Sequence, residues 1–381
     1  MSYKDEITKI IEQDNFRKIY NIEEKYEKFL VIDEKKMINF SSNDYLNLST
    51  NKNLVNEFIN KYSKSNEFIF SSTSSRLLTG SSKAYKKLEE DIAKLFKKEA
   101  SLLFNTGYQC NLGVVSTLVK RGDVIFSDKL NHASIIDGMK LSGCDFYRYK
   151  HLDYDNLEEI LKKHRQEYKR ALIVSETVFS MDGDIANIKK LVELKQKYNA
   201  YLMLDEAHAF GIFGNNSAGI ADKENLLEEI DIITATLGKS FASMGAFCTA
   251  NKEIIDYLTN KANSFIFSTA IPPINILWSS FLIEEKMNLI KEKSTKLKKL
   301  IQEAHIYIKD KGKTQIIPIV IGDSGKTVKI AQQLQAKGYF VLPVRPPTVP
   351  VNTSRFRLSL TSDITINEFK DVINTIKEVL Q

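Results

Sequence analysis

Apolar and polar positions follow two different periods along the middle of the chain. Short runs rich in apolar and β-branched residues predict strands at 101–104, 123–128, 145–149, 171–177, 200–205, 231–237 and 245–250. Tyr85, Leu88, Ile92 and Leu95 recur at three- and four-residue spacing, which predicts an amphipathic helix after Ser81 and Ser82. Helical stretches separate the first five predicted strands. This alternation is typical of α/β proteins with a mostly parallel sheet, here of seven strands, covered by helices.

The pattern changes after Pro272 and Pro273. A Lys/Glu-rich amphipathic stretch predicts one long helix over about residues 281–311. Predicted strands near 315–321, 340–344 and 355–361 then mix with predicted helices near 326–337 and 365–380. We therefore expect an N-terminal segment (1–45), a large domain (46–280) and a smaller C-terminal α+β domain (281–381).

Composition narrows the class of protein. The 381 residues are 43% hydrophobic, enough for a packed core, and the net charge of +6 comes from 54 basic and 48 acidic residues that are interleaved. No basic tract indicates binding to nucleic acid or to a membrane. The sequence has no uncharged apolar run of about 18 residues, and its first 14 residues carry no apolar signal core. We expect a soluble, cytoplasmic protein.

Cysteine and histidine spacing gives no metal site. Cys110, Cys144 and Cys248 lack metal-ligand or C-x-x-C spacing, so we expect small buried residues rather than disulfides. His151, His164 and His305 have no partners at ligand spacing, and we expect them at the surface.

The candidate chemistry lies at the ends of predicted strands. Asp205-Glu206-Ala207-His208 ends one apolar strand, and Lys239 follows Thr236-Leu237-Gly238 34 residues after Asp205. Ligands of open α/β sheets bind beyond the carboxyl ends of the strands. There an acid can pair with a pyridinium nitrogen, an imidazole can contact a phenolate oxygen, a hydroxyl can bind phosphate and a lysine can form a Schiff base. Together these groups predict a site for pyridoxal phosphate.

The position of Lys239 and two further residues support the same hypothesis. Lys239 precedes a small, apolar segment, where an imine avoids the cost of burying a free ammonium. Gly107, after the first strand, would let the backbone of a helix N-terminus approach phosphate. His132 stands at another strand-to-helix junction, where its flat ring could stack on a cofactor. For Gly107, His132 and Asp205 an ordinary turn residue is the alternative interpretation.

Two other functions fit the sequence less well. The Asp205–His208 box also occurs in a class of helicases, and residues 322–327 resemble a phosphate-binding loop. That loop motif requires four residues between its glycines, whereas this sequence has two, and the two motifs stand in reversed order. A dinucleotide-binding fold is disfavoured because the sequence contains no G-x-G-x-x-G.

Arginine use adds a candidate anion site. Only nine arginines accompany a large excess of lysines, and three of them lie between Arg345 and Arg357. Arginine provides a planar, bidentate fork that lysine lacks. The segment 345–357 is therefore a candidate for carboxylate binding.

At these residues the chain resembles the α-oxoamine synthase family of fold-type I pyridoxal phosphate enzymes, almost from end to end. The resemblance is carried by Phe40–Leu46, Ser74–Gly80, Glu176–Asp184, the Asp205 box and the Lys239 segment. It implies a pyridoxal-phosphate-dependent acyltransferase that works as a homodimer, with active sites at the subunit boundary. One departure is Ser240–Met244, where relatives often carry more glycine.

The resemblance also implies roles for individual residues. Lys239 forms the Schiff base, Asp205 pairs with the pyridine nitrogen, His208 contacts the phenolate oxygen and His132 stacks on the ring. Four more residues are implied at the cofactor: Ser180, Thr236, Gly107 and Tyr108. Asn43 and Arg357 are implied at the amino-acid carboxylate, Arg17 and Thr348 at the acyl substrate, and Arg345 at either.

Within the family, one stretch discriminates between substrates. Arg345–Pro350, followed by Arg355–Leu358, is most similar to members that join L-alanine to a pimeloyl thioester, of coenzyme A or acyl carrier protein, in biotin synthesis. Members that use glycine with acetyl-CoA, or serine with a long-chain acyl-CoA, stay open as alternatives. A non-catalytic partner subunit of such an enzyme is disfavoured because Lys239, Asp205 and His132 are all present.

Overall fold

The computed structural model describes residues 2–381 and contains two compact units. One unit comprises residues 52–179 and 185–294, and the other comprises the residues up to Asn51 together with 180–184 and 295–381. The predicted domain bounds stay a prediction, and the compact units differ from them at the first 51 residues, at 180–184 and at 281–294. Each unit is described by itself below.

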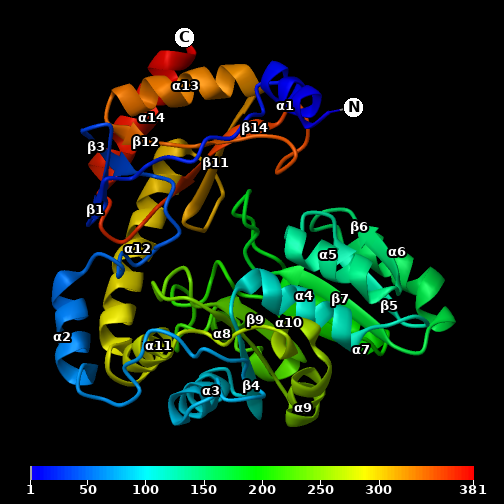
Figure 1. Cartoon of the computed structure of the whole chain (residues 1–381). Helices are drawn as coiled ribbons and strands as arrows, with labels where there is room; N and C mark the ends of the chain where they lie inside the picture. Colours follow the sequence, from blue (N-terminus) through cyan, green and yellow to red (C-terminus); the bar gives the residue numbers. More distant parts are fainter. Residues whose placement is uncertain (1) are drawn as a thin grey trace. The chain divides into compact units, whose positions relative to one another are not determined.

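A seven-stranded sheet forms the centre of the first unit (Figure 1). In sheet order the strands are β4 (Ala100–Phe104), β10 (Ala246–Ala250), β9 (Ile232–Thr236), β8 (Tyr201–Asp205), β7 (Ala171–Glu176), β5 (Val124–Asp128) and β6 (Asp145–Tyr149). β10 is antiparallel to both neighbours, and every other neighbouring pair is parallel. All seven predicted strands are present within a residue or two of their predicted bounds, which confirms the predicted fold class.

Both faces of this sheet are buried. Cys248 of β10 lies in a buried cluster with Cys110 and Val114. Its neighbour Phe247 packs against Phe96 and Phe210, with ring centroids 5.2 and 5.3 Å apart. Successive strand residues point to opposite faces, so both sides of β10 need apolar side chains. This explains why the strands read as continuous apolar runs. The three cysteines are buried and free, as predicted.

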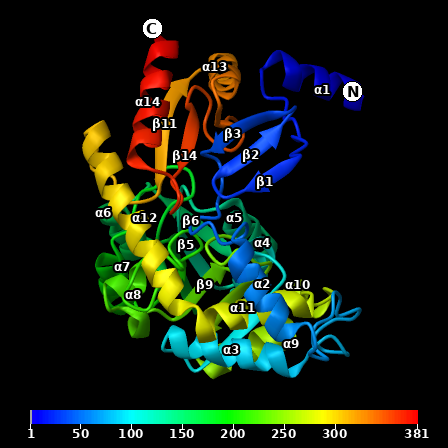
Figure 2. The same ribbon diagram turned by 90° about the vertical axis from the view of Figure 1, so that its left-hand side faces the viewer.

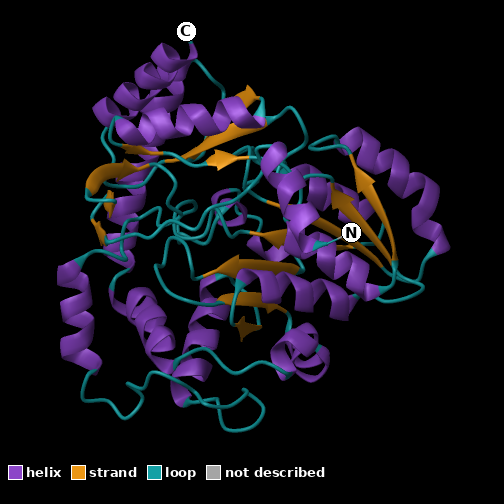
Figure 3. Cartoon of the chain, turned by 45° about the horizontal axis from the view of Figure 1, so that its top comes forward, coloured by secondary structure: helices purple, strands orange, loops and turns teal. Residues whose placement is uncertain are grey.

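Helices cover the sheet, and Figure 3 distinguishes them from strands by colour. A first group packs together through one buried cluster: α4 (Gly107–Leu118), α5 (Ala133–Ser142), α9 (Lys252–Lys261) and α10 (Asn263–Ile266). The remaining helices of the unit are α2 (Lys52–Tyr62), α3 (Lys83–Leu95), α6 (Tyr154–His164), α7 (Ile188–Lys197), α8 (Ile220–Lys223) and α11 (Pro273–Glu285). α3 begins directly after Ser82, in agreement with the predicted amphipathic helix.

The second unit contains two small sheets (Figure 2). One has the order β1 (Glu24–Tyr26), β2 (Phe29–Ile32), β3 (Lys35–Asn39) and β12 (Tyr339–Phe340), and the other has β11 (Ile316–Gly322), β14 (Ser354–Ser359) and β13 (Pro343–Val344). Its helices include α1 (Tyr3–Glu12), α13 (Ser324–Ala336) and α14 (Ile366–Leu380). β3 pairs in parallel with β12, and this pairing joins the N-terminal residues to the C-terminal part of the chain.

Two expectations are wrong. The single long helix over 281–311 is instead α11, which ends at Glu285, and α12 (Met287–Ile308); the chain leaves helical geometry at Lys286, with φ −116° and ψ 11°. His305, expected at the surface, is buried, and its Nε2 lies 2.9 Å from the carbonyl oxygen of Thr314. Within residues 2–381, no helix is both long enough and apolar enough to cross a membrane.

Candidate active site

The predicted cofactor residues of the first unit gather at one edge of the seven-stranded sheet. Gly107 follows β4, His132 follows β5, Asp205 ends β8, and Thr236 ends β9. These four strands run in the same direction, because β10 alone is antiparallel to its neighbours. Their carboxyl ends therefore meet at a single edge, where α/β sheets place their ligands.

Lys239 and His208 are in direct contact at this edge. Nζ of Lys239 lies 2.8 Å from Nε2 of His208, which is buried. Lys239 stands on the short connection between β9 and β10, which is closed by backbone hydrogen bonds from Leu237 N to Gly245 O at 2.9 Å and from Ser243 N to Leu237 O at 3.0 Å. The amine is thus held on a short, fixed loop beside an imidazole.

Asp205 is buried and acts as a hydrogen-bond acceptor on both oxygens. Its Oδ1 accepts from the backbone N–H of Ala207 at 2.8 Å, and its Oδ2 accepts from Nδ2 of Asn111 at 2.6 Å. A carboxylate at this position has the charge that a pyridinium nitrogen requires.

His132 is the N-cap of α5. Its Nδ1 accepts a hydrogen bond from the backbone N–H of Ser134 at 3.3 Å and lies 2.8 Å from the Ser134 hydroxyl. The side chain keeps substantial exposure to solvent, yet the protein around it lowers the pKa of the imidazole by desolvation. The charge of Asp205 raises this pKa and that of Lys239 lowers it further. The net effect favours a neutral ring.

The start of α4 is the candidate site for an anion. Gly107 is the first residue of α4, and a Cβ placed on it would lie 3.7 Å from Cβ of Thr236. The Thr236 hydroxyl donates to Gly245 O at 3.0 Å and accepts from Gly238 N at 3.1 Å. The first N–H groups of a helix lack intrahelical partners, so this end attracts anions. Tyr108, next to Gly107, is exposed, and its hydroxyl donates to Asp137.

Glu206 is a buried carboxyl that the sequence analysis did not single out as a site residue. It accepts hydrogen bonds from the backbone N–H groups of Ile220 at 3.0 Å and Ala221 at 2.8 Å, and from the Thr177 hydroxyl. Burial raises its pKa to about 7, against the opposing effect of these donors. It ties the start of α8 to the end of β8.

Arg357 is the centre of a polar cluster in the second unit. Its guanidinium donates to the backbone oxygen of Ser180, to Asn43 Oδ1 at 3.1 Å, to Ser359 Oγ at 2.7 Å and to Tyr45 Oη at 2.9 Å. Arg357 is buried on β14. The structure therefore brings together three residues that were predicted separately, namely Asn43, Ser180 and Arg357.

The remaining predicted residues form a second cluster in the same unit. Nη2 of Arg17 donates to Oγ1 of Thr348 at 2.9 Å, and both residues are exposed. Arg345 donates to the backbone oxygens of Asp14 and Phe16. Partial burial, and then the charge of Arg17, lower the pKa of Arg345. Arg345 thus holds the segment that carries Arg17.

Asn111 and Ser134 were also missed by sequence reasoning. Both are buried polar residues in the helices that follow β4 and β5. The available signal was an amide four residues after Gly107, on the face of α4 that is otherwise apolar. Their partners lie far away along the chain, so only the fold reveals their contacts.

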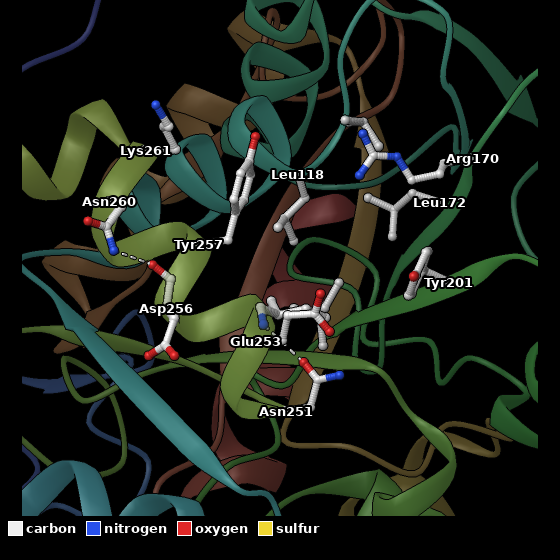
Figure 4. Close-up of a pocket in the computed structure, with 13 residues that line it drawn as sticks. Leu118, Arg170, Leu172, Tyr201, Asn251, Glu253, Asp256, Tyr257, Asn260 and Lys261 are labelled. Carbon is white, nitrogen blue, oxygen red and sulfur yellow. Dashed lines mark hydrogen bonds between the residues drawn. The ribbon is translucent and has the colours of Figure 1, made fainter.

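A separate pocket of about 540 Å³ lies at the opposite edge of the sheet (Figure 4). Leu172, Tyr201 and Ile232, at or next to the first positions of β7, β8 and β9, line it together with α9. Its lining includes none of the predicted site residues. This pocket is therefore separate from the candidate site at the carboxyl edge.

Comparisons with known proteins show the family of this chain. The model of the family Aminotransferase class I and II matches residues 35–376. A Haemophilus influenzae protein provisionally named 8-amino-7-oxononanoate synthase is 42% identical, over 97% of this chain and 98% of its own. A Neisseria gonorrhoeae protein with the same provisional name is 44% identical, over 90% of this chain and 91% of its own.

Solved structures are similar to this chain in fold. The 8-amino-7-oxononanoate synthase from Francisella tularensis is 27% identical, with a TM-score of 0.74 over 90% of this chain and 98% of that one. A serine palmitoyltransferase from S. paucimobilis, solved with PLP bound, is 24% identical and shares the fold, with a TM-score of 0.89 over 99% and 96% of the chains. The chain therefore belongs to the aminotransferase class I and II family, and within it to the α-oxoamine synthases, as a pyridoxal-phosphate-dependent acyltransferase.

Proposed function

We propose that this enzyme condenses L-alanine with a pimeloyl thioester, of coenzyme A or acyl carrier protein, in biotin synthesis. The products are 8-amino-7-oxononanoate, carbon dioxide and the free thiol. The observation that carries the catalytic part is the contact between Lys239 and His208 at the carboxyl edge that also holds Asp205. The choice of substrates is supported by the names of relatives that match almost the whole chain, and by the segment Arg345–Pro350.

The residues of the first unit fit pyridoxal phosphate. Asp205 offers a carboxylate for the ring nitrogen, and the start of α4, beside Thr236, offers backbone donors for the phosphate. Lys239 offers the amine that carries the cofactor, and His132 offers a flat ring. When bound, the cofactor draws negative charge away from the amino-acid Cα.

Lys239 is the proton carrier in this proposal. With the amino acid bound, the free Nζ would remove the proton from Cα. His208, with Nε2 at 2.8 Å from Nζ, would orient the amine and contact the phenolate oxygen of the cofactor. Asp205 would pair with the ring nitrogen, where a carboxylate stabilises a nearby cation. Cα would then attack the carbonyl carbon of the thioester, so that a C–C bond replaces the C–S bond and the thiolate leaves and takes a proton from solvent. The carboxyl group would leave as carbon dioxide, and Nζ would return its proton to the same carbon.

Substrate binding is assigned to the second unit. We infer that Arg357 and Asn43 bind the carboxylate of L-alanine and that Ser180 contacts the cofactor. A planar guanidinium suits a carboxylate because two parallel hydrogen bonds can form. Arg17 and Thr348 are assigned to the acyl substrate, and Arg345 to either substrate. A homodimer is the expected assembly, as in the family that the sequence resembles.

A panel of substrates tests the proposal. Purified enzyme loaded with cofactor is offered L-alanine, glycine or L-serine, each with pimeloyl-, acetyl- or palmitoyl-CoA, and thiol release and carbon dioxide are measured together. The expected result is the highest kcat/KM for L-alanine with pimeloyl-CoA, with equal amounts of thiol and carbon dioxide. Preference for glycine with acetyl-CoA, or for serine with palmitoyl-CoA, would replace the substrate assignment and leave the family intact.

A further inference from the structure

A buried chain of hydrogen bonds joins Asp205 to His132 across three elements. Oδ2 of Asp205 lies 2.6 Å from Nδ2 of Asn111 on α4, and the same Nδ2 lies 3.1 Å from Oγ of Ser134. Oγ of Ser134 lies 2.8 Å from Nδ1 of His132 at the start of α5. Asn111 is 3% exposed and Ser134 is fully buried. The two residues assigned to the edge and the face of the cofactor ring are thus connected through the protein.

The direction of these hydrogen bonds follows from their chemistry. The hydroxyl of Thr234 donates to Oδ1 of Asn111 at 2.8 Å, which places the amide nitrogen on the other side. An ionised carboxylate can only accept, so the atom of Asn111 that faces Asp205 must be Nδ2. The second hydrogen on Nδ2 is then directed to Ser134. No freedom is left for the amide to flip.

The hydrogen bond that Ser134 accepts from Asn111 determines how its hydroxyl faces the imidazole of His132. Because its oxygen accepts from Asn111, its hydroxyl hydrogen is available for Nδ1 of His132. The backbone N–H of Ser134 points to the same Nδ1 at 3.3 Å. Two donors facing one ring nitrogen require a lone pair there. The proton of the neutral ring must therefore reside on Nε2.

We propose that Asn111 and Ser134 are positioning residues that hold His132 as the neutral Nε2–H tautomer and link its ring to the carboxylate of Asp205. The meaning of this for catalysis rests on the proposed function, since a neutral ring can stack on a cationic cofactor ring without repulsion between like charges. Desolvation and Lys239 act in the same direction on His132, and Asp205 opposes them.

A plain helix cap is the simpler explanation of the His132 contact, and it makes a different prediction. A cap needs the Ser134 backbone N–H alone, so it would be unaffected by changes to the Ser134 hydroxyl or to Asn111. The proposed network needs both side chains. Removal of either should weaken the preference for a lone pair on Nδ1, and the backbone N–H of Ser134 alone keeps part of it.

The test uses the full-length, cofactor-free protein labelled with ¹⁵N-histidine. The Nδ1 and Nε2 signals of His132, identified by their loss in His132→Gln, report which nitrogen is protonated. The wild type should show an unprotonated Nδ1 and a protonated Nε2 at neutral pH. Ser134→Ala and Asn111→Leu should each raise the ratio of Nδ1–H to Nε2–H tautomer about fivefold, the effect of one lost hydrogen bond, and raise the pKa of His132.

Ser142→Ala, which removes a hydroxyl from the far end of α5, is the matched control and should leave the ratio unchanged. If Asn111→Leu does not fold, as judged by circular dichroism, Ser134→Ala carries the test. A wild-type protein with the proton on Nδ1, or an unchanged ratio in Ser134→Ala, would overturn the proposal. No substrate or cofactor is present in this measurement, so its failure would leave the proposed reaction standing, and failure of the substrate panel would leave the tautomer result standing.

Discussion

Nζ of Lys239 lies 2.8 Å from Nε2 of His208, although the two residues are separated by strand β9 and stand on different connections of the sheet. One of these nitrogens must donate and the other accept. The amine and the imidazole therefore influence each other's proton before any ligand enters. The candidate site is organised around this pair.

His208→Leu should remove this partner of the amine while keeping the side chain apolar and compact. We expect kcat/KM to fall by about 10²-fold, the lower end of the range for proton-transfer groups. The cofactor absorbance should titrate at a different pH, since a hydrogen bond near the amine is lost. His208→Asn, which can still hydrogen-bond, should recover part of the activity. Equal activity of the wild type and His208→Leu would argue against a role for this contact.

Asp205→Asn should keep the size of the side chain and remove its charge. We expect kcat to fall by about 10²- to 10³-fold, comparable with the loss of one electrostatic stabiliser of a transition state. Steady-state kinetics with saturating cofactor measures this. Glu206→Gln is the matched control, because Glu206 is the adjacent buried acid and bonds Ile220 and Ala221 instead. If both variants lose activity equally, the special role of Asp205 is wrong.

Arg357→Lys should weaken binding of the amino acid. Lysine keeps the positive charge but cannot form two parallel hydrogen bonds to a carboxylate, so KM for L-alanine should rise by about tenfold or more. KM for the thioester should change little. Arg355→Lys, two residues away on the same strand and paired with Asp182, provides the comparison. A rise in KM for the thioester alone would move Arg357 to the acyl site.

Glu206 should make the protein less stable as pH rises. Its pKa, raised by burial to about 7, lies above the ordinary value of 4.5, so the folded state keeps the proton to higher pH than the unfolded state. The contribution of Glu206 to the free energy of unfolding is complete below about pH 4.5 and declines up to about pH 7, by on the order of 3 kcal/mol.

Urea unfolding of the cofactor-free protein at several pH values measures this, with Glu206→Gln as the reference. The free energy of unfolding of the wild type should fall relative to that of Glu206→Gln as the pH rises from about 4.5 to about 7. A difference that is constant with pH would show that Glu206 stays ionised when folded.

The sheet could be predicted because its strands are buried on both faces. Continuous apolar runs such as Leu202-Met203-Leu204 mark such strands without knowledge of their neighbours. The break between α11 and α12 could not be predicted, since Lys286 is neither glycine nor proline and the helical pattern continues through it. His305 was placed wrongly because its partner, the Thr314 carbonyl, is a backbone group that no side-chain spacing reveals.

The candidate site was predictable to a similar extent. Asp205, His208 and Lys239 stand out because strand ends and residue chemistry coincide there. Asn111 and Ser134 do not stand out in the sequence, because an amide within α4 and a serine at the start of α5 are ordinary residues. Only the fold places them between Asp205 and His132. Supporting residues of this kind depend on tertiary contacts and leave little trace in one sequence.

Reduction of the cofactor-loaded protein with borohydride, followed by peptide mapping, shows whether Lys239 carries the cofactor. We expect one pyridoxyl label, on the peptide that contains Lys239, and loss of that label in Lys239→Ala. A label on another of the chain's lysines in the wild type, or persistent labelling of Lys239→Ala, would show that Lys239 is not the attachment site.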